Sequence, residues 1–239
     1  MKIYASSAAL KAKARGALSG RYLTFIGTFI TLTFLQYVIT VPNAVLQLKP
    51  PVSIILYYGL GFLIEVFFGI FKAGLAYMFL CNACGQYVNS QNIFSGFAHG
   101  PGKAMQIQCW PSLLLFLPGL LPDLCMQQFF SSKNDQWLIY GLVIALIFLP
   151  FTLFVEILYS QAFYIMLDFP ELEASECLKA SRKLMKGSKG RYLYLVLSFL
   201  PLSLLGTLSC GIGNFFVLPY QEQTFANFYL DLIEKKQAA

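Results

Sequence analysis

The chain has 239 residues, of which 57% are hydrophobic, 16% aromatic and only 12% charged, and its mean hydropathy is +0.64. A soluble domain carries about 25% charged residues, so this composition excludes an ordinary soluble fold and predicts an integral membrane protein. The net charge is +6. The basic residues cluster beside apolar runs and form no separate basic domain, so we expect no nucleic-acid binding.

Apolar runs long enough to cross a bilayer follow one another along the chain. The first four cover residues 22–46, 52–80, 110–130 and 137–167. A Pro-containing break at 48–51, a polar connection at 81–109 and the turn SSKNDQ at 131–136 separate them. The fourth run is longer than a bilayer needs, which predicts that it tilts or projects beyond the lipid.

The third run contains LPGLLP at residues 117–122. Pro118 and Pro122 remove backbone donors, which predicts a broken helix with free carbonyls inside the membrane. A simple kink and a transporter-type binding site are both consistent with such a break.

The last apolar region, 191–220, has two interpretations. Residues 191–209 can span alone, with a return over 210–229 after the break at Gly211 to Gly213. The alternative is one span that ends near Leu218 and continues as an amphipathic tail. Lys235 and Lys236 favour the first, with six crossings. The predicted fold is thus a single all-α transmembrane domain over residues 1–239, with five to six transmembrane helices and cytoplasmic amphipathic segments at 1–21 and 168–190.

Basic residues concentrate in two places, before the first span and between the fourth and the fifth. They are Lys2, Lys11, Lys13, Arg15 and Arg21, and then Lys179, Arg182, Lys183, Lys186, Lys189 and Arg191. The positive-inside rule predicts that both segments, and with them the N-terminus, are cytoplasmic. An even number of crossings must then separate them, so the third run crosses despite its prolines.

The segment 168–190 reads as an amphipathic helix with Pro170 in its first turn and Gly187 as a left-handed stop. Helical spacing gives it one weakly apolar face: Ala174, Cys177, Leu178, Ser181, Leu184 and Met185. Its five basic residues, together with Arg191 directly after it, form a candidate face for anionic headgroups or for a membrane-protein partner. GRYL occurs at 20–23 and again at 190–193, which indicates either an internal duplication or two similar membrane entrances.

Four ionisable residues lie inside apolar runs: Glu65, Lys72, Asp123 and Glu156. Such residues are costly in a bilayer and are functional candidates by default. Glu65 and Lys72 lie two turns apart on one helix face, where they can line a polar path or pair with Glu156 across helices. The alternatives are a link between helices, a Lys72 that reaches the interface, or a protonated Glu without a role.

Catalytic and metal-binding patterns are missing from the sequence. His99 is the only histidine, and Cys81 with Cys84 has no second pair, so we expect no metal and no cofactor. No P-loop, nucleophile elbow or zinc-protease motif occurs, so we expect no enzyme and name no catalytic residue.

The runs DFPELEASECLKASRKLMKGSKGRYLYLVLSF, GIGNFFVLPY and FANFYLDL resemble an uncharacterised family of bacterial integral membrane proteins, domain of unknown function 975. KARGALSG and LFLPGLLPDL fit the same family, and the resemblance covers most of the chain. It implies the cell membrane and a shared fold. No activity is established for that family, so it implies no catalytic residue.

The prediction for function is a non-enzymatic accessory or scaffold protein that engages lipid or another membrane protein. The alternative is a small transporter or lipid-handling protein that uses the break at Pro118 and Pro122 with Glu65 and Glu156, and an intramembrane enzyme ranks third. The sequence leaves the substrate, the partner and the oligomeric state open.

Overall fold

The computed structural model describes residues 4–45 and 52–237, and every regular element within them is a helix. The predicted break at 48–51 and Lys2 lie outside these residues. The helices are α1 (Ser7–Leu18), α2 (Tyr22–Val45), α3 (Val52–Ala83), η1 (Ser90–Phe94), α4 (Ser95–Ala98), α5 (Pro101–Ser132), α6 (Asp135–Tyr159), α7 (Ala162–Asp168), α8 (Ala174–Leu184), α9 (Lys189–Leu197), α10 (Leu200–Leu208) and α11 (Asn214–Gln237).

Five helical stretches in the described ranges are long and apolar enough to cross a membrane. They are Tyr22–Val41, Leu56–Ala83, Pro101–Ser132, Asp135–Asp168 and Lys189–Leu208. Large apolar side chains such as Leu23, Phe34 and Ile147 point outward from them. Water would make that surface unfavourable, whereas lipid does not. The predicted all-α membrane fold is therefore confirmed.

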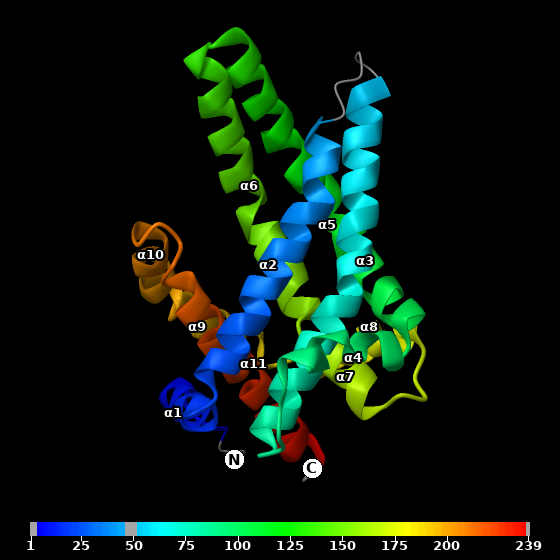
Figure 1. Cartoon of the computed structure of the whole chain (residues 1–239), viewed down its shortest axis with the longest axis vertical. Coiled ribbons are helices and arrows are strands. Elements are labelled where there is room, and N and C mark those ends of the chain that lie inside the picture. The colour runs from blue at the N-terminus through cyan, green and yellow to red at the C-terminus, as the bar shows by residue number, and fades with distance from the viewer. Residues whose placement is uncertain (1–3, 46–51, 238–239) are drawn as a thin grey trace.

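The long helices α2, α3, α5 and α6 run along the long axis of the molecule (Figure 1). Both termini, α1, α4 and α8 gather at one end, and the turn between α5 and α6 lies at the other. The basic segments before α2 and before α9 are consequently at the same end. An even number of crossings lies between them, as the distribution of basic residues required.

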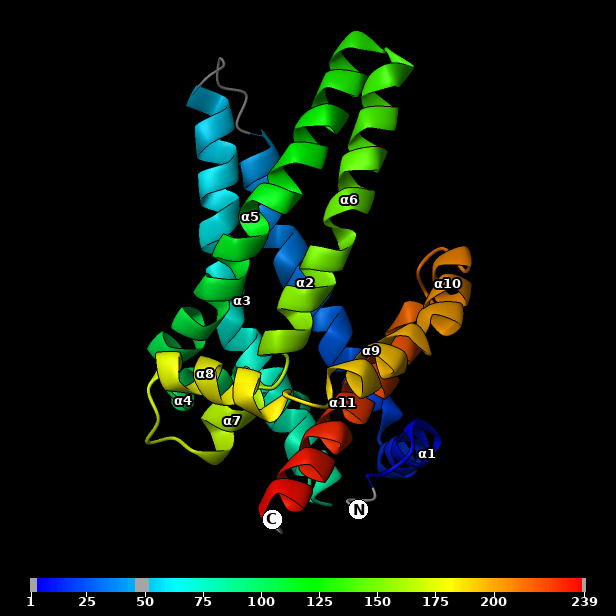
Figure 2. The ribbon, with the colours of Figure 1, turned by 180° about the vertical axis from the view of Figure 1, so that it is seen from behind.

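Helix α5 is continuous through Pro118 and Pro122, which agrees with a simple kink and excludes the broken helix with free carbonyls. Figure 2 shows a bent α5 rather than an interrupted one. Each proline removes one N–H and displaces one carbonyl, but the other backbone groups of α5 keep their partners, and in a membrane helix this produces a kink. The helix also begins before the apolar run, at Pro101, directly after the left-handed Gly100 (φ 80°).

Helix α6 ends at Tyr159, inside the predicted fourth run, because α8 supplies hydrogen bonds at that point. Ser181 of α8 donates from its hydroxyl to the carbonyl of Leu158 at 2.8 Å and accepts the backbone N–H of Gln161 at 3.3 Å. A side chain that inserts into the helical ladder in this way redirects the chain. The run therefore turns into the short α7 and does not continue as one straight helix.

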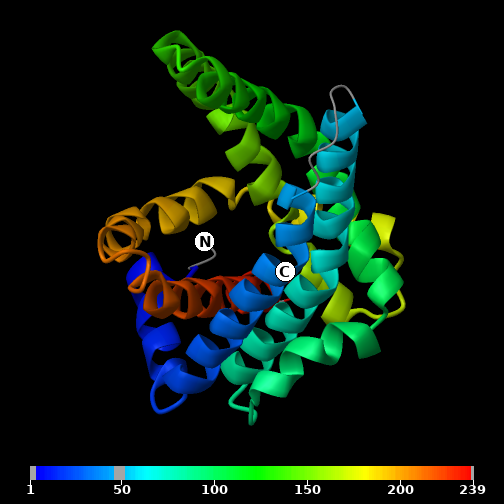
Figure 3. The ribbon, with the colours of Figure 1, turned by 45° about the horizontal axis from the view of Figure 1, so that its top comes forward.

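The C-terminal region turns back at the predicted glycine break. Cys210 (φ 55°) and Gly211 (φ 84°) adopt left-handed conformations between α10 and α11. In Figures 1 and 2 this turn lies about halfway along the long axis, and Figure 3 shows α11 running back beneath α2. The return after the break that the first path predicts is therefore present, while the sixth crossing of that path stays a prediction. Helix α11 itself is not among the five candidate spans.

Helix α8 uses its predicted apolar face for packing against protein. All six residues of that face are buried, and the helix lies against α5, α6 and α7. The predicted start at Pro170 is wrong, since α8 begins at Ala174, where the Glu173 N–H donates to the Glu176 carboxylate at 3.0 Å. This capping pair defines the first turn more strongly than the proline does. Gly187 has φ 85°, as the predicted stop requires.

The densest packing lies at the end that carries both termini. Phe25 and Phe79 stack with ring centroids 4.7 Å apart, and Tyr164 and Tyr229 stack at 5.1 Å. The connection between α3 and α5 folds closely onto α3. A Cβ added at Gly96 would lie 2.0 Å from the Ile70 carbonyl oxygen. Only glycine permits this approach.

Candidate functional site

The four intramembrane ionisable residues line one cavity of about 850 Å³. Glu65 and Lys72 come from α3, Asp123 from α5 and Glu156 from α6. The remaining walls come from α7, α9 and α11, and Thr40 adds a contact from α2. A fifth charged group, Glu222 of α11, lines the same space. Residues far apart in the sequence therefore meet around a groove within the helical bundle.

One face of α5 forms the longest wall of this groove. Its lining residues follow helical spacing: Gln108, Pro111, Ser112, Leu115, Phe116, Gly119, Leu120 and Asp123. From Gln108 to Asp123 an α-helix rises roughly 22 Å. Pro118 and Pro122 are not part of this face, and Pro118 is buried elsewhere. Neither proline of the predicted break therefore lines the groove, although both lie close to this face by helical spacing.

Glu65 is compensated by its neighbours. Its Oε1 accepts from the Lys72 ammonium at 3.0 Å and from the Gln108 amide at 2.8 Å. Gln108 also donates to the Ser112 hydroxyl at 2.9 Å. Lys72 therefore pairs within its own helix and not with Glu156, and Gln108 links α3 to α5 as an interhelical hydrogen bond does. About half of the Glu65 and Lys72 side chains stays accessible from the groove.

The carboxyl groups of Glu156 and Glu222 have no comparable polar partners. Within the described residues, neither carboxyl group takes part in a hydrogen bond or a close ion pair, and the Lys72 ammonium reaches both only through space. Glu222 is partly buried, and part of its side chain faces the cavity. The aromatic side chains of Tyr164 and Tyr192 stand close enough for the Glu222 charge to act on them.

The sequence contained a signal for Glu222 in the polar triplet Gln221 to Gln223, which is costly in a bilayer unless it faces protein. The structure meets this condition. Gln223 is fully buried, accepts from the Asn82 amide at 2.6 Å and donates to the Phe79 carbonyl at 3.2 Å. Glu222, one position earlier, turns into the groove instead.

Asp123 lies at the other end of the groove, near Tyr58, whose hydroxyl accepts from Gln127 at 3.2 Å. Between the two ends the walls are apolar and aromatic, with Phe62 and Phe116 in edge contact at 5.9 Å. The groove therefore has charged ends and an apolar middle.

The predicted basic face on residues 179–191 is divided by the structure. Lys179, Arg182 and Lys183 are exposed on α8, and Lys186 is exposed directly after it. Lys189 is half-buried, and its ammonium lies 4.7 Å from the centre of the Phe154 ring. The exposed face thus consists of the first four residues, which we call the α8 basic face.

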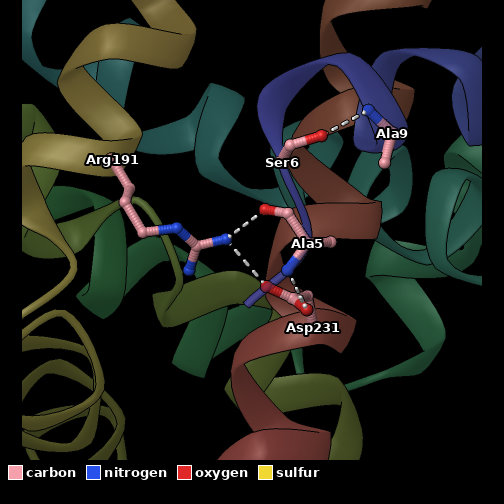
Figure 4. A network of polar contacts seen from close by, with 5 residues as sticks. All are labelled: Ala5, Ser6, Ala9, Arg191 and Asp231. Atoms are coloured by element: carbon pink, nitrogen blue, oxygen red, sulfur yellow. Dashed lines mark hydrogen bonds and ion pairs between the residues drawn. The ribbon is translucent and has the colours of Figure 1, made fainter. Parts of the chain in front are cut away.

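Arg191 points inward, as Figure 4 shows. Its Nη2 donates to the Ala5 carbonyl at 2.8 Å and to the Asp231 carboxylate at 2.9 Å, and the Ala5 N–H donates to Asp231 at 3.1 Å. The guanidinium also lies over the Tyr4 and Phe228 rings. Arg191 therefore joins the N-terminus to α9 and α11 and is not available to a headgroup.

The arginine of the first GRYL has a related role. Arg21 donates to the Asn82 side chain at 2.9 Å and to the Gln86 carbonyl at 2.7 Å. Each of the two arginines thus connects an ascending helix to the helix that returns beside it. This parallel is compatible with duplication and with convergence alike, so duplication stays a prediction.

The residues singled out for metal or redox chemistry lie apart from the groove. Cys81 is buried, Cys84 is exposed and both are free thiols. His99 donates from Nδ1 to the Ser95 carbonyl oxygen at 2.8 Å and lies against the Tyr77 ring. In the described part of the chain, no three His, Cys, Asp or Glu residues are placed to hold a metal ion.

Comparison with known proteins gives one family and no individual relative. No curated protein and no solved structure matches the sequence. A family model described as "Protein of unknown function (DUF975)" matches residues 1–236. That match covers α1 to α11, including every residue of the groove and the α8 basic face. The chain therefore belongs to the DUF975 family of proteins of unknown function.

Proposed function

We propose that this protein is a small transporter or lipid-handling protein that binds an amphipathic molecule in the groove. The observation that carries the proposal is the convergence of Glu65, Lys72, Asp123, Glu156 and Glu222 on one cavity. Its volume, about 850 Å³, lies in the range of pockets that hold small molecules. Charged groups at membrane depth persist where they face a ligand, water or one another.

The topology of the helices supports a location for this activity. We place the protein in the cell membrane with its N-terminus, C-terminus and α8 in the cytoplasm, because the basic residues of α1 and α8 lie at the same end of the molecule. The groove then lies inside the bilayer, and Glu222 marks its cytoplasmic end. No residue in it is assigned a catalytic role.

Purification from the native membrane in mild detergent, followed by mass spectrometry of everything that stays bound, tests the proposal. We expect a lipid or small molecule in stoichiometric amount, which is lost in Glu156→Gln while the protein stays monodisperse. The matched control is Glu234→Gln, an exposed carboxylate on α11 away from the groove. A preparation that carries a protein partner and no small molecule would contradict the proposal.

A second candidate function, an accessory or scaffold role, is favoured by the α8 basic face. The opposite side of α8 packs against protein, and its Lys and Arg side chains are exposed, where anionic headgroups or a partner can reach them. Replacing Arg182, Lys183 and Lys186 together by Gln should release a bound partner or weaken binding to anionic vesicles. Lys133→Gln, at the opposite end of the molecule, is the control, and equal loss in both variants would count against this role.

A further inference from the structure

The groove has an excess of negative charge, and two of its carboxyl groups, Glu156 and Glu222, lie at the end opposite Asp123. Four carboxyl groups line the cavity together with a single ammonium, that of Lys72. The Lys72 ammonium pairs with Oε1 of Glu65 at 3.0 Å, and the Gln108 amide donates a hydrogen bond to the same oxygen. Glu156 and Glu222 therefore face the cavity without a cation of their own.

Glu222 is the second observation that points to a ligand. Glu222 is partly buried, lines the cavity and takes no hydrogen bond from any described residue. A carboxylate at membrane depth needs a polar partner, and water or a ligand in the cavity can supply one. The groups that face it are Lys72 from α3, Glu156 from α6, Tyr164 from α7 and Tyr192 from α9.

Aromatic rings surround the two carboxyl groups. Tyr159, Phe163, Tyr164, Tyr192 and Phe225 line the same end of the cavity. Aromatic faces attract cations, and rings combined with carboxylates are the usual lining of sites for quaternary ammonium groups. An anionic headgroup would meet repulsion from the carboxylates at the same place.

The middle of the groove fits an apolar chain. Phe62 of α3 and Leu115, Phe116 and Leu120 of α5 line it. The α5 wall from Gln108 to Asp123 is roughly 22 Å long, which is enough for an extended alkyl chain. Shape and lining therefore match a molecule with a cationic head and an apolar tail.

We propose that the groove binds an amphiphile whose ammonium headgroup lies between Glu156 and Glu222 and whose tail runs along α3 and α5. This inference rests on the proposed function and specifies its ligand. The ammonium can belong to a cationic amphiphile or to a zwitterionic membrane lipid. Lys72 acts in this arrangement as an internal competitor, since its ammonium is attracted by the same carboxylates.

Photoreactive tetradecyl probes test the inference in vesicles of neutral lipid. Four headgroups on the same chain are compared: trimethylammonium, phosphocholine, sulfonate and uncharged maltoside. Crosslinked peptides are identified by mass spectrometry, and half-saturation is measured for each probe. We expect the trimethylammonium probe to label the groove faces of α3 and α5, at a concentration at least about tenfold below that of the sulfonate probe.

The variants separate charge recognition from folding. Glu156→Gln and Glu222→Gln should each weaken trimethylammonium labelling at least about tenfold, while Glu234→Gln leaves it unchanged. Lys72→Gln should strengthen labelling, because it removes the competing ammonium. A strengthened site shows that the fold is intact and cannot result from general damage.

The remaining outcomes are distinguishable. Equal labelling by phosphocholine and trimethylammonium supports ammonium recognition and identifies a zwitterionic lipid as the source. Equal labelling of the groove by all four probes overturns the cationic headgroup but leaves the groove as a binding site. Absence of labelling in the groove by any probe overturns both this inference and the proposed function.

Discussion

Asn82 is the residue on which we base the most detailed prediction. It is 2% exposed and lies at the end of α3, where three parts of the chain meet. Its side-chain oxygen accepts from Arg21, and its amide donates to the Ala17 carbonyl at 3.1 Å and to Gln223 at 2.6 Å. Replacement by Leu keeps the approximate volume of the side chain and removes all three bonds.

The expected cost follows from these contacts. Each lost hydrogen bond contributes about 0.5–1.5 kcal/mol, and the Gln223 oxygen left without a donor adds about 1–3 kcal/mol because that side chain is fully buried. Arg21 keeps its bond to the Gln86 carbonyl, which limits the loss on its side. We therefore expect Asn82→Leu to lower the free energy of unfolding by about 3–5 kcal/mol.

A double-mutant cycle with Gln223→Leu isolates the pair. When both partners are apolar, the penalty for the orphaned oxygen disappears. The double variant should therefore be more stable than the sum of the single changes implies, by about 1–2 kcal/mol. Reversible unfolding in detergent micelles, followed by tyrosine fluorescence, measures each corner, and Gln128→Leu on the exposed surface of α5 is the control. A cost below about 1 kcal/mol for Asn82→Leu, or strictly additive changes, would refute the reasoning.

Two further predictions concern packing and the N-terminal network. Gly96→Ala should destabilise by at least about 1–3 kcal/mol in the same unfolding assay, because its Cβ would lie 2.0 Å from the Ile70 carbonyl oxygen, whereas Gly59→Ala meets nothing within 4 Å and should not destabilise. Asp231→Ala should cost near the lower end of about 3–5 kcal/mol, since Arg191 keeps some exposure, and should make the Ala5 amide exchange its hydrogen faster, while Glu234→Ala leaves that exchange unchanged.

Several features of the fold are predictable from local pattern and charge. Apolar run lengths located α2 and α3, and the basic residues required 1–21 and 168–190 to lie at one end. The spacing of Ala174, Cys177 and Leu178 identified the buried face of α8. These signals depend on periodicity and composition, and the bilayer constrains both properties directly.

The incorrect predictions concern places where a distant residue decides the local structure. Helix α6 ends at Tyr159 because the Ser181 hydroxyl of α8 donates a hydrogen bond to the Leu158 carbonyl. No sequence pattern near Tyr159 predicts this contact. Pro118 and Pro122 leave α5 continuous because their neighbours retain helical bonds. The pairing of Lys72 with Glu65, and not with Glu156, likewise depends on Gln108 of α5.

For the candidate site, residue type predicted which side chains take part, whereas the sequence did not predict how they are arranged in space. The cost of charge in lipid was enough to select Glu65, Lys72, Asp123 and Glu156. That they surround one cavity depends on the faces that α3, α5 and α6 present to one another. Glu222 was recognisable only as part of a costly triplet, because its orientation is set by the burial of its neighbour Gln223 against Asn82.

The attachment of α1 to α11 has a consequence for biosynthesis. The first helix to leave the ribosome is held by the last: Asn227 donates to the Leu10 carbonyl, and Asp231 accepts the Ala5 N–H. All five apolar stretches precede Asn227 and Asp231 in the chain, so they leave the ribosome before either bond can form. A chain that terminates before Asn227 therefore contains all five apolar stretches and lacks both bonds that hold α1.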